Sequence, residues 1–65
     1  MRGPGFYKAE GLMLHRAPTK VEHKDVVLLA SSSEDRAKVW DGWRWFDSEE
    51  EARVHYGLPI EEEGP

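Results

Sequence analysis

Three histidines are the side chains of this chain best suited to bind a soft metal ion such as zinc. They are His15, His23 and His55, and no two of them are spaced to share a face of one predicted helix or strand. The chain has no cysteine, and a structural zinc site takes four Cys or His ligands at short, regular spacings. We therefore predict no metal site and interpret the imidazoles as surface or half-buried groups.

The serine hydroxyls are the remaining candidate nucleophiles, and they belong to Ser31, Ser32, Ser33 and Ser48. None of them lies in a Gly-x-Ser-x-Gly turn or close to a histidine in the sequence. No glycine is followed by Lys-Ser or Lys-Thr, so no phosphate-binding loop is predicted. A chain of 65 residues also leaves little room for a nucleophile, a base and a substrate cleft. We therefore predict that the protein is not an enzyme and holds no cofactor.

Two runs of glutamate, Glu49–Glu51 and Glu61–Glu63, consist of residues that can bind calcium or magnesium. The first run follows a serine at the start of a predicted helix, where acids suit the helix dipole. The second run lacks the alternating Asp and Gly spacing of a calcium loop. Neither run is therefore interpreted as a metal site.

Trp40 is the residue best suited to contact a partner, because it lies at a predicted turn and is close in sequence to three cations, Arg36, Lys38 and Arg44. An exposed tryptophan surrounded by cations can anchor a protein partner or stack on an unpaired base. We predict these four residues as a partner-binding site. The alternative is structural, with Trp40 folded back over Lys38 or Arg44 as a cation–π pair.

The elements that must position these residues begin with an imperfectly alternating apolar stretch over residues 6–16. We expect strand here, with Gly11 either between two short strands or at a bulge. Pro18 ends this stretch, because proline cannot donate to a sheet. Val26–Ala30 is a run of apolar residues that is typical of a strand covered on both faces. The polar segment Ser31–Asp35 is expected to be a turn.

Residues 37–46 predict a β-hairpin, because an Asp41–Gly42 turn lies between two short alternating runs. Two registers are possible. A two-residue loop would pair Trp40 with Trp43 and would mix aromatic and charged side chains on each face.

A three-residue loop would instead pair Val39 with Trp43 and Ala37 with Trp45. This register gathers the apolar side chains on one face and the three cations on the other, so we prefer it. It leaves Trp40 in the turn as the most exposed tryptophan, with Trp43 and Trp45 in the core.

The C-terminal helix is the most strongly indicated element. Ser48 and Glu51 have the spacing of a capping box, in which each side chain accepts a hydrogen bond from the other's backbone amide. Glu49 and Arg53 are spaced to form an ion pair on the helix surface. Gly57 is placed to end the helix in the left-handed conformation.

The composition indicates a thermophilic source, because the chain has no Asn, Gln or Cys and 34% of it is charged. Chance in so short a chain is the alternative. The net charge of −4 is unevenly spread, with eight Lys and Arg against six acids in residues 1–46 and one against seven in residues 47–65. This asymmetry is too mild to indicate nucleic acid as the partner.

No signal peptide or membrane span is predicted, since no apolar run approaches ~18 residues. We therefore expect a cytoplasmic protein with no membrane partner and no small-molecule substrate. Residues 5–60 are expected to form one domain, and residues 61–65 a flexible acidic tail.

Together these patterns predict an α+β fold, with about four mostly antiparallel strands in a meander or partial barrel and one short C-terminal helix. One short helix cannot cover both faces of Val26–Ala30, so either the sheet curls or a second copy covers it as a homodimer. The predicted function is a non-enzymatic binding module that docks on another protein through a sheet or hairpin surface. Accessory and regulatory proteins of phages and mobile elements are often of this kind. The alternative is a nucleic-acid-binding sheet that uses Trp40 with Arg36, Lys38 and Arg44.

Overall fold

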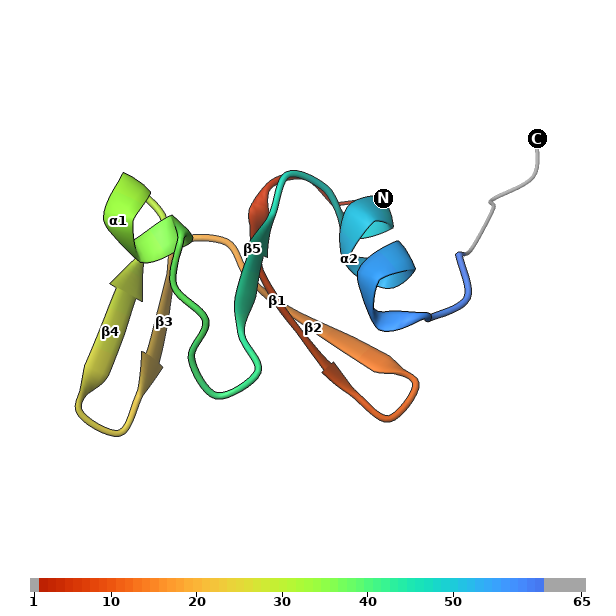
Figure 1. The fold of residues 1–65 in the computed structure, drawn as a ribbon, viewed down its shortest axis with the longest axis horizontal. Coiled ribbons are helices and arrows are strands. Elements are labelled where there is room, and N and C mark those ends of the chain that lie inside the picture. Colours follow the sequence, from red (N-terminus) through yellow and green to blue (C-terminus); the bar gives the residue numbers. More distant parts are fainter. Residues whose placement is uncertain (1, 61–65) are drawn as a thin grey trace.

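The structure is a computed structural model that describes residues 2–60 of the chain (Figure 1). Within these residues, five short strands form two antiparallel sheets, and the longer of two short helices lies near the C-terminus. The predicted α+β class is therefore confirmed. The elements in chain order are β1 (Gly5–Glu10), β2 (Met13–Ala17), β3 (Lys20–His23), β4 (Val26–Leu29), α1 (Ser33–Arg36), β5 (Arg44–Phe46) and α2 (Glu49–Tyr56).

Strand β1 is the centre of the molecule, because both of its faces are covered. It lies between β2 and β5 in a three-stranded sheet. Phe6 and Tyr7 point to opposite faces of this sheet, and both are fully buried. Phe6 packs with Val21 and Leu28 of the β3–β4 hairpin, whereas Tyr7 lies on the face that carries α2. Figure 1 shows the hairpin on the left, the three-stranded sheet in the middle and α2 on the right.

The stretch expected to be strand over residues 6–16 contains β1 and β2, which pair antiparallel with each other. Glu10 pairs with Met13, so a two-residue loop joins the strands. Gly11 occupies this loop with a φ of 61°, a conformation that glycine adopts without steric cost. The chain leaves β2 at Ala17, just before Pro18, as expected.

The β3–β4 hairpin corrects two expectations. Strand β3 was not predicted from the sequence, and β4 is covered on only one face. Leu28 is 1% exposed, whereas Val27 and Leu29 on the opposite face are 47% and 43% exposed. The physical reason is that the hairpin is an outer layer of the molecule, so no further element of residues 2–60 packs against its outer face.

The Asp41–Gly42 turn has the two-residue register, so the preferred three-residue register is wrong. Trp40 pairs with Trp43 in an antiparallel bridge, and Asp41 and Gly42 have φ angles of 52° and 85°. Positive φ at both central residues defines a type I′ turn, whose twist suits a two-residue hairpin. The expected burial of one whole apolar face therefore did not decide the register.

Helix α1 explains why the hairpin stops after a single pair. The segment expected to be a simple turn, Ser31–Asp35, overlaps this helix, which Ser32 caps by accepting from the amide of Asp35 at 3.3 Å. The Asp35 carboxylate in turn accepts from the amide of Leu29 at 2.9 Å. These bonds hold residues 33–36 beside β4, so the residues before Trp40 cannot continue a strand along β5.

Helix α2 begins as predicted. The Ser48 hydroxyl accepts from the Glu51 amide at 3.2 Å, and Glu49 pairs with Arg53 at 2.8 Å. The reciprocal bond of the capping box differs by one residue, because the Glu51 carboxylate accepts from the amide of Asp47 at 3.2 Å. The acids of this first turn therefore stabilise the helix start, and no metal is needed to explain them.

The end of α2 is also as predicted. Gly57 has a φ of 71° and the left-handed conformation. The amide of Leu58 donates to the carbonyl of Arg53 at 2.8 Å, and the Leu58 side chain is buried. This arrangement satisfies the last carbonyls of the helix. The predicted acidic tail, residues 61–65, lies outside the described residues.

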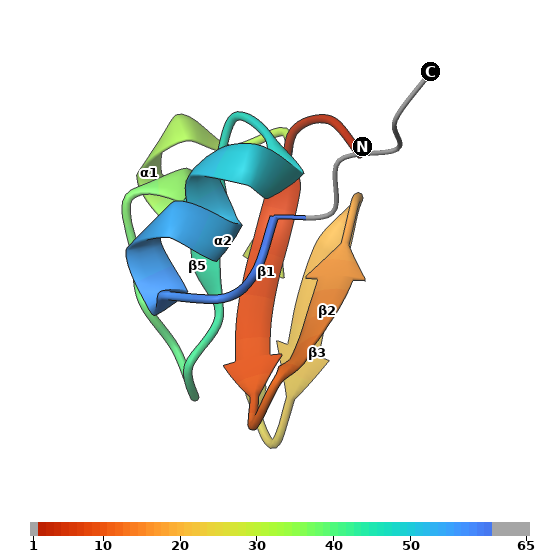
Figure 2. The same ribbon diagram turned by 90° about the vertical axis from the view of Figure 1, so that its right-hand side faces the viewer.

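Neither helix in the described part of the chain is long and apolar enough to cross a membrane. Figure 2 views the molecule along the layers, with α2 nearest the viewer and in front of β1 and β5. This helix packs on the face of the three-stranded sheet that carries Tyr7 and Phe46.

Candidate protein-binding surface

Trp40, the predicted anchor residue, contributes to the core. Its ring packs against the buried apolar cluster of β1, β3 and β4, and its Nε1 donates to the carbonyl of His23 at 3.3 Å. Trp43 and Trp45 pack against the same cluster, and all three tryptophans are half-buried. The expected division into one exposed and two buried tryptophans is therefore wrong. The two-residue turn is the reason, because it makes Trp40 a paired residue instead of a loop residue.

Arg36 forms the cation–π contact of this region. Its guanidinium lies over the ring of Trp45, at 5.5 Å from the centroid, and it also donates to the carbonyl of Ala30. The sequence predicted a cation–π pair as one alternative, but with Lys38 or Arg44 over Trp40. The guanidinium of Arg36 is therefore occupied by the Ala30 carbonyl and the Trp45 ring, and it supports the packing of that ring.

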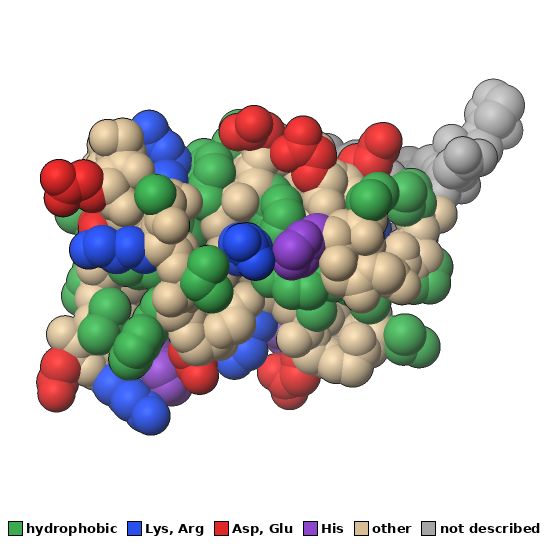
Figure 3. All heavy atoms as spheres, in the orientation of Figure 1, with side chains coloured by type: hydrophobic (Ala, Val, Ile, Leu, Met, Phe, Trp, Pro, Cys, Tyr) green, Lys and Arg blue, Asp and Glu red, His purple; other side chains and the backbone are tan. Residues whose placement is uncertain are grey.

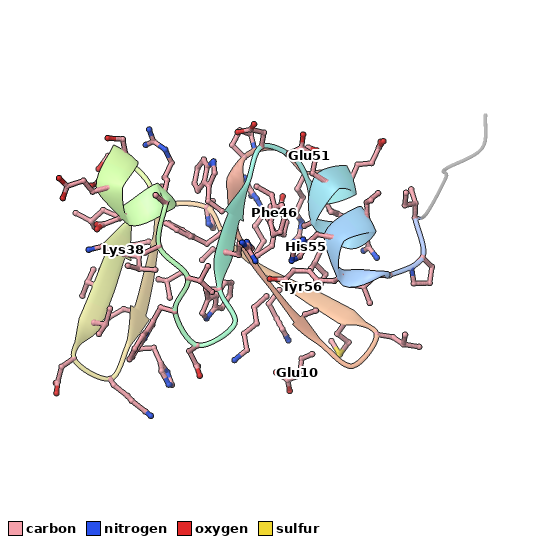
Figure 4. The ribbon with its side chains drawn as sticks, in the orientation of Figure 1. Glu10, Lys38, Phe46, Glu51, His55 and Tyr56 are labelled. Carbon is pink, nitrogen blue, oxygen red and sulfur yellow. The ribbon has the colours of Figure 1, made fainter. Side chains whose placement is uncertain are left out.

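Lys38 and Arg44 lie apart from each other. Lys38 pairs with Asp35 at 3.4 Å, and the guanidinium of Arg44 lies 3.4 Å from Nε2 of His55 on α2. In Figure 4 the labelled Lys38 is on the left, beside the β3–β4 hairpin, whereas His55 is on α2 to the right. The structure therefore places Lys38 beside the β3–β4 hairpin and Arg44 beside α2.

The three cations do not form the single row that the three-residue register would have given. Arg44 and Trp45 are consecutive in β5, so their side chains point to opposite faces of the sheet. Arg36 stacks on Trp45 and hence lies on the face opposite Arg44. On the side shown in Figure 3, Lys and Arg side chains appear as separate spots among apolar, acidic and neutral atoms.

An aromatic cluster fixes α2 on the sheet. Phe46 lies 5.7 Å from Tyr56 and 5.3 Å from His55, centroid to centroid, and these three labelled side chains converge in Figure 4. The Tyr56 hydroxyl lies 3.1 Å from the carbonyl oxygen of Tyr7 and 2.9 Å from that of Gly42. Desolvation by burial raises the pKa of both tyrosines. The phenols are therefore structural donors.

Asp41 connects three parts of the fold. One of its carboxylate oxygens lies 3.2 Å from Nε2 of His23 in β3 and 3.4 Å from Nζ of Lys8 in β1. All three side chains are partly open to solvent. An exposed ion pair of this kind contributes at most about 1 kcal/mol. We interpret this cluster as a surface contact that links β1, β3 and the Asp41–Gly42 turn.

Asp35 has a more specific role at the free edge of β4. Its carboxylate accepts from the amide of Leu29 at 2.9 Å, and this hydrogen bond holds the pKa of Asp35 below its ordinary value. The contact occupies an amide that would otherwise be free to pair with another strand. Helix α1 therefore protects this edge of the hairpin.

The exposed apolar side chains include a surface whose individual residues the sequence did not identify. The large ones are Leu12, Met13, Val27, Leu29, Val39, Val54 and Ile60. Val27 and Leu29 differ from the others because they lie two residues apart on the same face of one strand. Across the hairpin they pair with Glu22 and Lys20, which form an ion pair at 3.2 Å. We call these four residues, Lys20, Glu22, Val27 and Leu29, the outer hairpin face.

One sequence feature pointed to this face without identifying it. The run Val26–Ala30 predicts a strand covered on both faces, and a single short helix cannot supply that cover. The alternation of polar and apolar residues over Lys20–His23 indicates that the paired strand has one solvated face. With the observed pairing of Glu22 with Val27 and of Lys20 with Leu29, these two patterns place the uncovered side at Val27 and Leu29.

The three histidines lie in separate places, and each has a different neighbour. His15 is 3.6 Å from Glu10, His23 is near Asp41, and His55 is near Arg44. Within the described residues, no three side chains of His, Asp or Glu are grouped as metal ligands. Comparisons of the chain with protein-family models, with curated proteins and with solved structures give no match.

Proposed function

We propose that the protein is a non-enzymatic, cytoplasmic binding module that docks on another protein through the outer hairpin face. The observation that carries this proposal is the exposure of Val27 and Leu29, at 47% and 43%, on a strand whose opposite face is in the core. Protein contact sites combine an apolar centre with polar side chains beside it. Here Lys20 and Glu22 lie next to the apolar pair, on β3.

The arrangement favours a protein over a nucleic acid as the partner. Binding to a phosphate backbone needs several cations along one surface. Arg36 and Arg44 lie on opposite faces of β5, and Lys38 is paired with Asp35. The half-buried Trp40 is also poorly placed to stack on a base, because its ring packs on the core.

The test uses the intact chain as bait in lysate of the source organism, in its wild-type form and with Val27→Lys and Leu29→Lys combined. Val54→Lys is the matched control, because Val54 is an exposed valine on α2, away from the hairpin. We expect a defined protein to be retained by the wild type and by the Val54 variant and lost by the double variant.

Two results would contradict this proposal. One is retention of the same proteins by the double variant, which would remove the outer hairpin face from consideration. The other is recovery of nucleic acid that is lost when Arg36, Lys38 and Arg44 are changed to Glu. That result would support the nucleic-acid alternative instead. Circular dichroism spectra of all variants would show that the fold is retained.

A further inference from the structure

The free edge of β3 presents backbone groups that can pair with another strand. In an antiparallel pair, residues alternate between those whose N–H and C=O point at the partner strand and those whose groups point away. The Ala30 amide donates to the Thr19 carbonyl at 2.9 Å. The backbone groups of these two residues therefore point toward each other, between the two strands. The register then makes Lys20 and Glu22 the outward-pointing residues of β3.

The opposite strand supports this assignment. Leu29 pairs with Lys20, and its amide points away from β3 to the carboxylate of Asp35, at 2.9 Å. The closing pair of the two-residue loop, His23 with Val26, is also expected to point inward. The alternation therefore holds along the whole hairpin, and it fixes which amides of β3 are directed outward.

The two edges of the hairpin differ in whether their outward-pointing backbone groups have a hydrogen-bond partner. At β4, α1 supplies Asp35 to occupy the amide of Leu29. At β3, no other segment of the described chain forms a hydrogen bond with the backbone of Lys20 or Glu22. In Figure 1 the segment between α1 and β5 overlaps the region beside β3, but Figure 2 separates the two in depth, with that segment at the left and β3 at the right.

We propose that β3 pairs antiparallel with β3 of a second copy of this chain, about a two-fold axis at Val21. This register is the one in which the outward-pointing residues meet. It sets Lys20 opposite Glu22 of the second copy and Glu22 opposite Lys20 of the second copy. Two residues per strand then form hydrogen-bonded pairs across the axis.

The charges on β3 select this partner. Charged side chains on an edge strand usually oppose pairing, because like charges meet. Here the sign alternates about Val21, so each cation of one copy faces an anion of the other. Lys20 and Glu22 already attract each other within one chain, at 3.2 Å, and the two-fold register adds two further opposite-charge neighbours. The strand is therefore self-complementary in charge.

Pairing would also complete the smaller sheet. Two strands alone make a marginal sheet, and three or more with an apolar face are more stable. The dimer joins two β3–β4 hairpins into a four-stranded sheet in the order β4-β3-β3-β4. Val27 and Leu29 of both copies would then lie on one continuous outer face. The pairing itself does not depend on the proposed docking function.

Charge exchange tests the pairing in the full chain. Lys20→Glu places Glu opposite Glu22 of the second copy, and Glu22→Lys places Lys opposite Lys20. We expect each single variant to dimerise about tenfold more weakly than the wild type in analytical ultracentrifugation. An equimolar mixture of the two variants should restore dimers, because Glu then faces Lys at every position. Lys24→Glu, in the turn of the same hairpin, is the control that should leave dimerisation unchanged.

Amide exchange on the wild type gives an independent measurement that needs no variant. Protection of the Lys20 and Glu22 amides should rise with protein concentration, whereas the outward amide of Val27 at the β4 edge should not change. A wild-type protein that stays monomeric up to its solubility limit would overturn the proposal. So would a dimer whose Lys20 and Glu22 amides keep exchanging, or a mixture of the single variants that does not associate.

Discussion

Trp40 and Trp43 face each other across the Asp41–Gly42 turn and exchange both backbone hydrogen bonds, at 3.1 Å from Trp40 N to Trp43 O and 2.8 Å from Trp43 N to Trp40 O. This is the only pair of that hairpin within the described residues. It turns the indole of Trp40 toward the core and begins the strand that pairs with β1. The conformation of two turn residues therefore determines where the tryptophans lie.

Gly42→Val should lower the free energy of unfolding by more than about 1 kcal/mol. A Cβ at this position would meet only the flexible side chain of Lys8, at 3.5 Å, so crowding is not the cause. The cost comes from the φ of 85°, which a β-branched residue rarely adopts. Urea denaturation of the variant measures the change.

Asp41→Asn is the matched control for that change. Asparagine accepts positive φ as readily as aspartate, so the turn is kept and only the exposed carboxylate contacts with Lys8 and His23 are lost. We expect a loss below about 1 kcal/mol. If Gly42→Val costs no more than this control, the type I′ turn is not what holds the Trp40–Trp43 pair.

The elements that the sequence predicts well are those with local causes. The start of α2 at Ser48, its end at Gly57 and the break before Pro18 each depend on a residue that acts on its own neighbours. Strand β3 was missed because its four residues, Lys20–His23, show only one buried position, Val21. Its pairing depends on β4 and on the core, which local patterns do not report.

The candidate site was harder to predict, because it depends on contacts between separate elements. Burial of one apolar face favours the three-residue register, yet the hydrogen bond from the Leu29 amide to the Asp35 carboxylate keeps the chain beside β4. This contact between α1 and β4 removes the strand that would have carried Lys38 in a row with Arg44. The exposure of Val27 likewise follows from the position of the hairpin as an outer layer.

Ser48→Ala should lower the free energy of unfolding by about 1 kcal/mol, because the Glu51 amide loses the acceptor that it has at 3.2 Å. Ser33→Ala is the control, since Ser33 is the exposed first residue of α1 and is not its cap. Urea denaturation measures both. Equal stability of the two variants would mean that Ser48 is not the residue that stabilises the helix start.

Acid should destabilise the protein through Asp35 and Glu49. The hydrogen bond from the Leu29 amide lowers the pKa of Asp35, and the hydrogen bond from Arg53 lowers the pKa of Glu49. A lowered pKa in the folded state adds stability above the ordinary carboxyl value of about 4, and this stability is lost as the pH falls through the folded-state pKa.

The measurement is the free energy of unfolding as a function of pH. Asp35→Asn and Glu49→Gln should each make stability fall less steeply below about pH 4. Glu34→Gln is the control, because the Glu34 side chain makes no hydrogen bond in the described part of the chain. An unchanged acid profile in both test variants would contradict the assignment.

Alkali should act through the two tyrosines. Burial raises the pKa of Tyr7 and of Tyr56, so their contribution is complete below the ordinary value of about 10 and is lost as the pH rises through the folded-state values. Tyr56→Phe should flatten the alkaline limb and should also lower stability at neutral pH, because the carbonyls of Tyr7 and Gly42 lose a donor. A steeper alkaline limb in this variant would show that another group is responsible.

Trp40→Ala should destabilise the fold by about 3 kcal/mol, near the lower end of the range for a core tryptophan, because the ring is only half-buried. Trp40→Phe keeps much of the ring and loses the bond to the His23 carbonyl, so we expect about 1 kcal/mol. Val39→Ala is the control, since the neighbouring Val39 is exposed and should change stability little. Thermal and urea unfolding of the three variants rank them. If Trp40→Ala were as stable as Val39→Ala, the indole would contribute nothing to the core, and Trp40 would again be the strongest candidate for a partner contact.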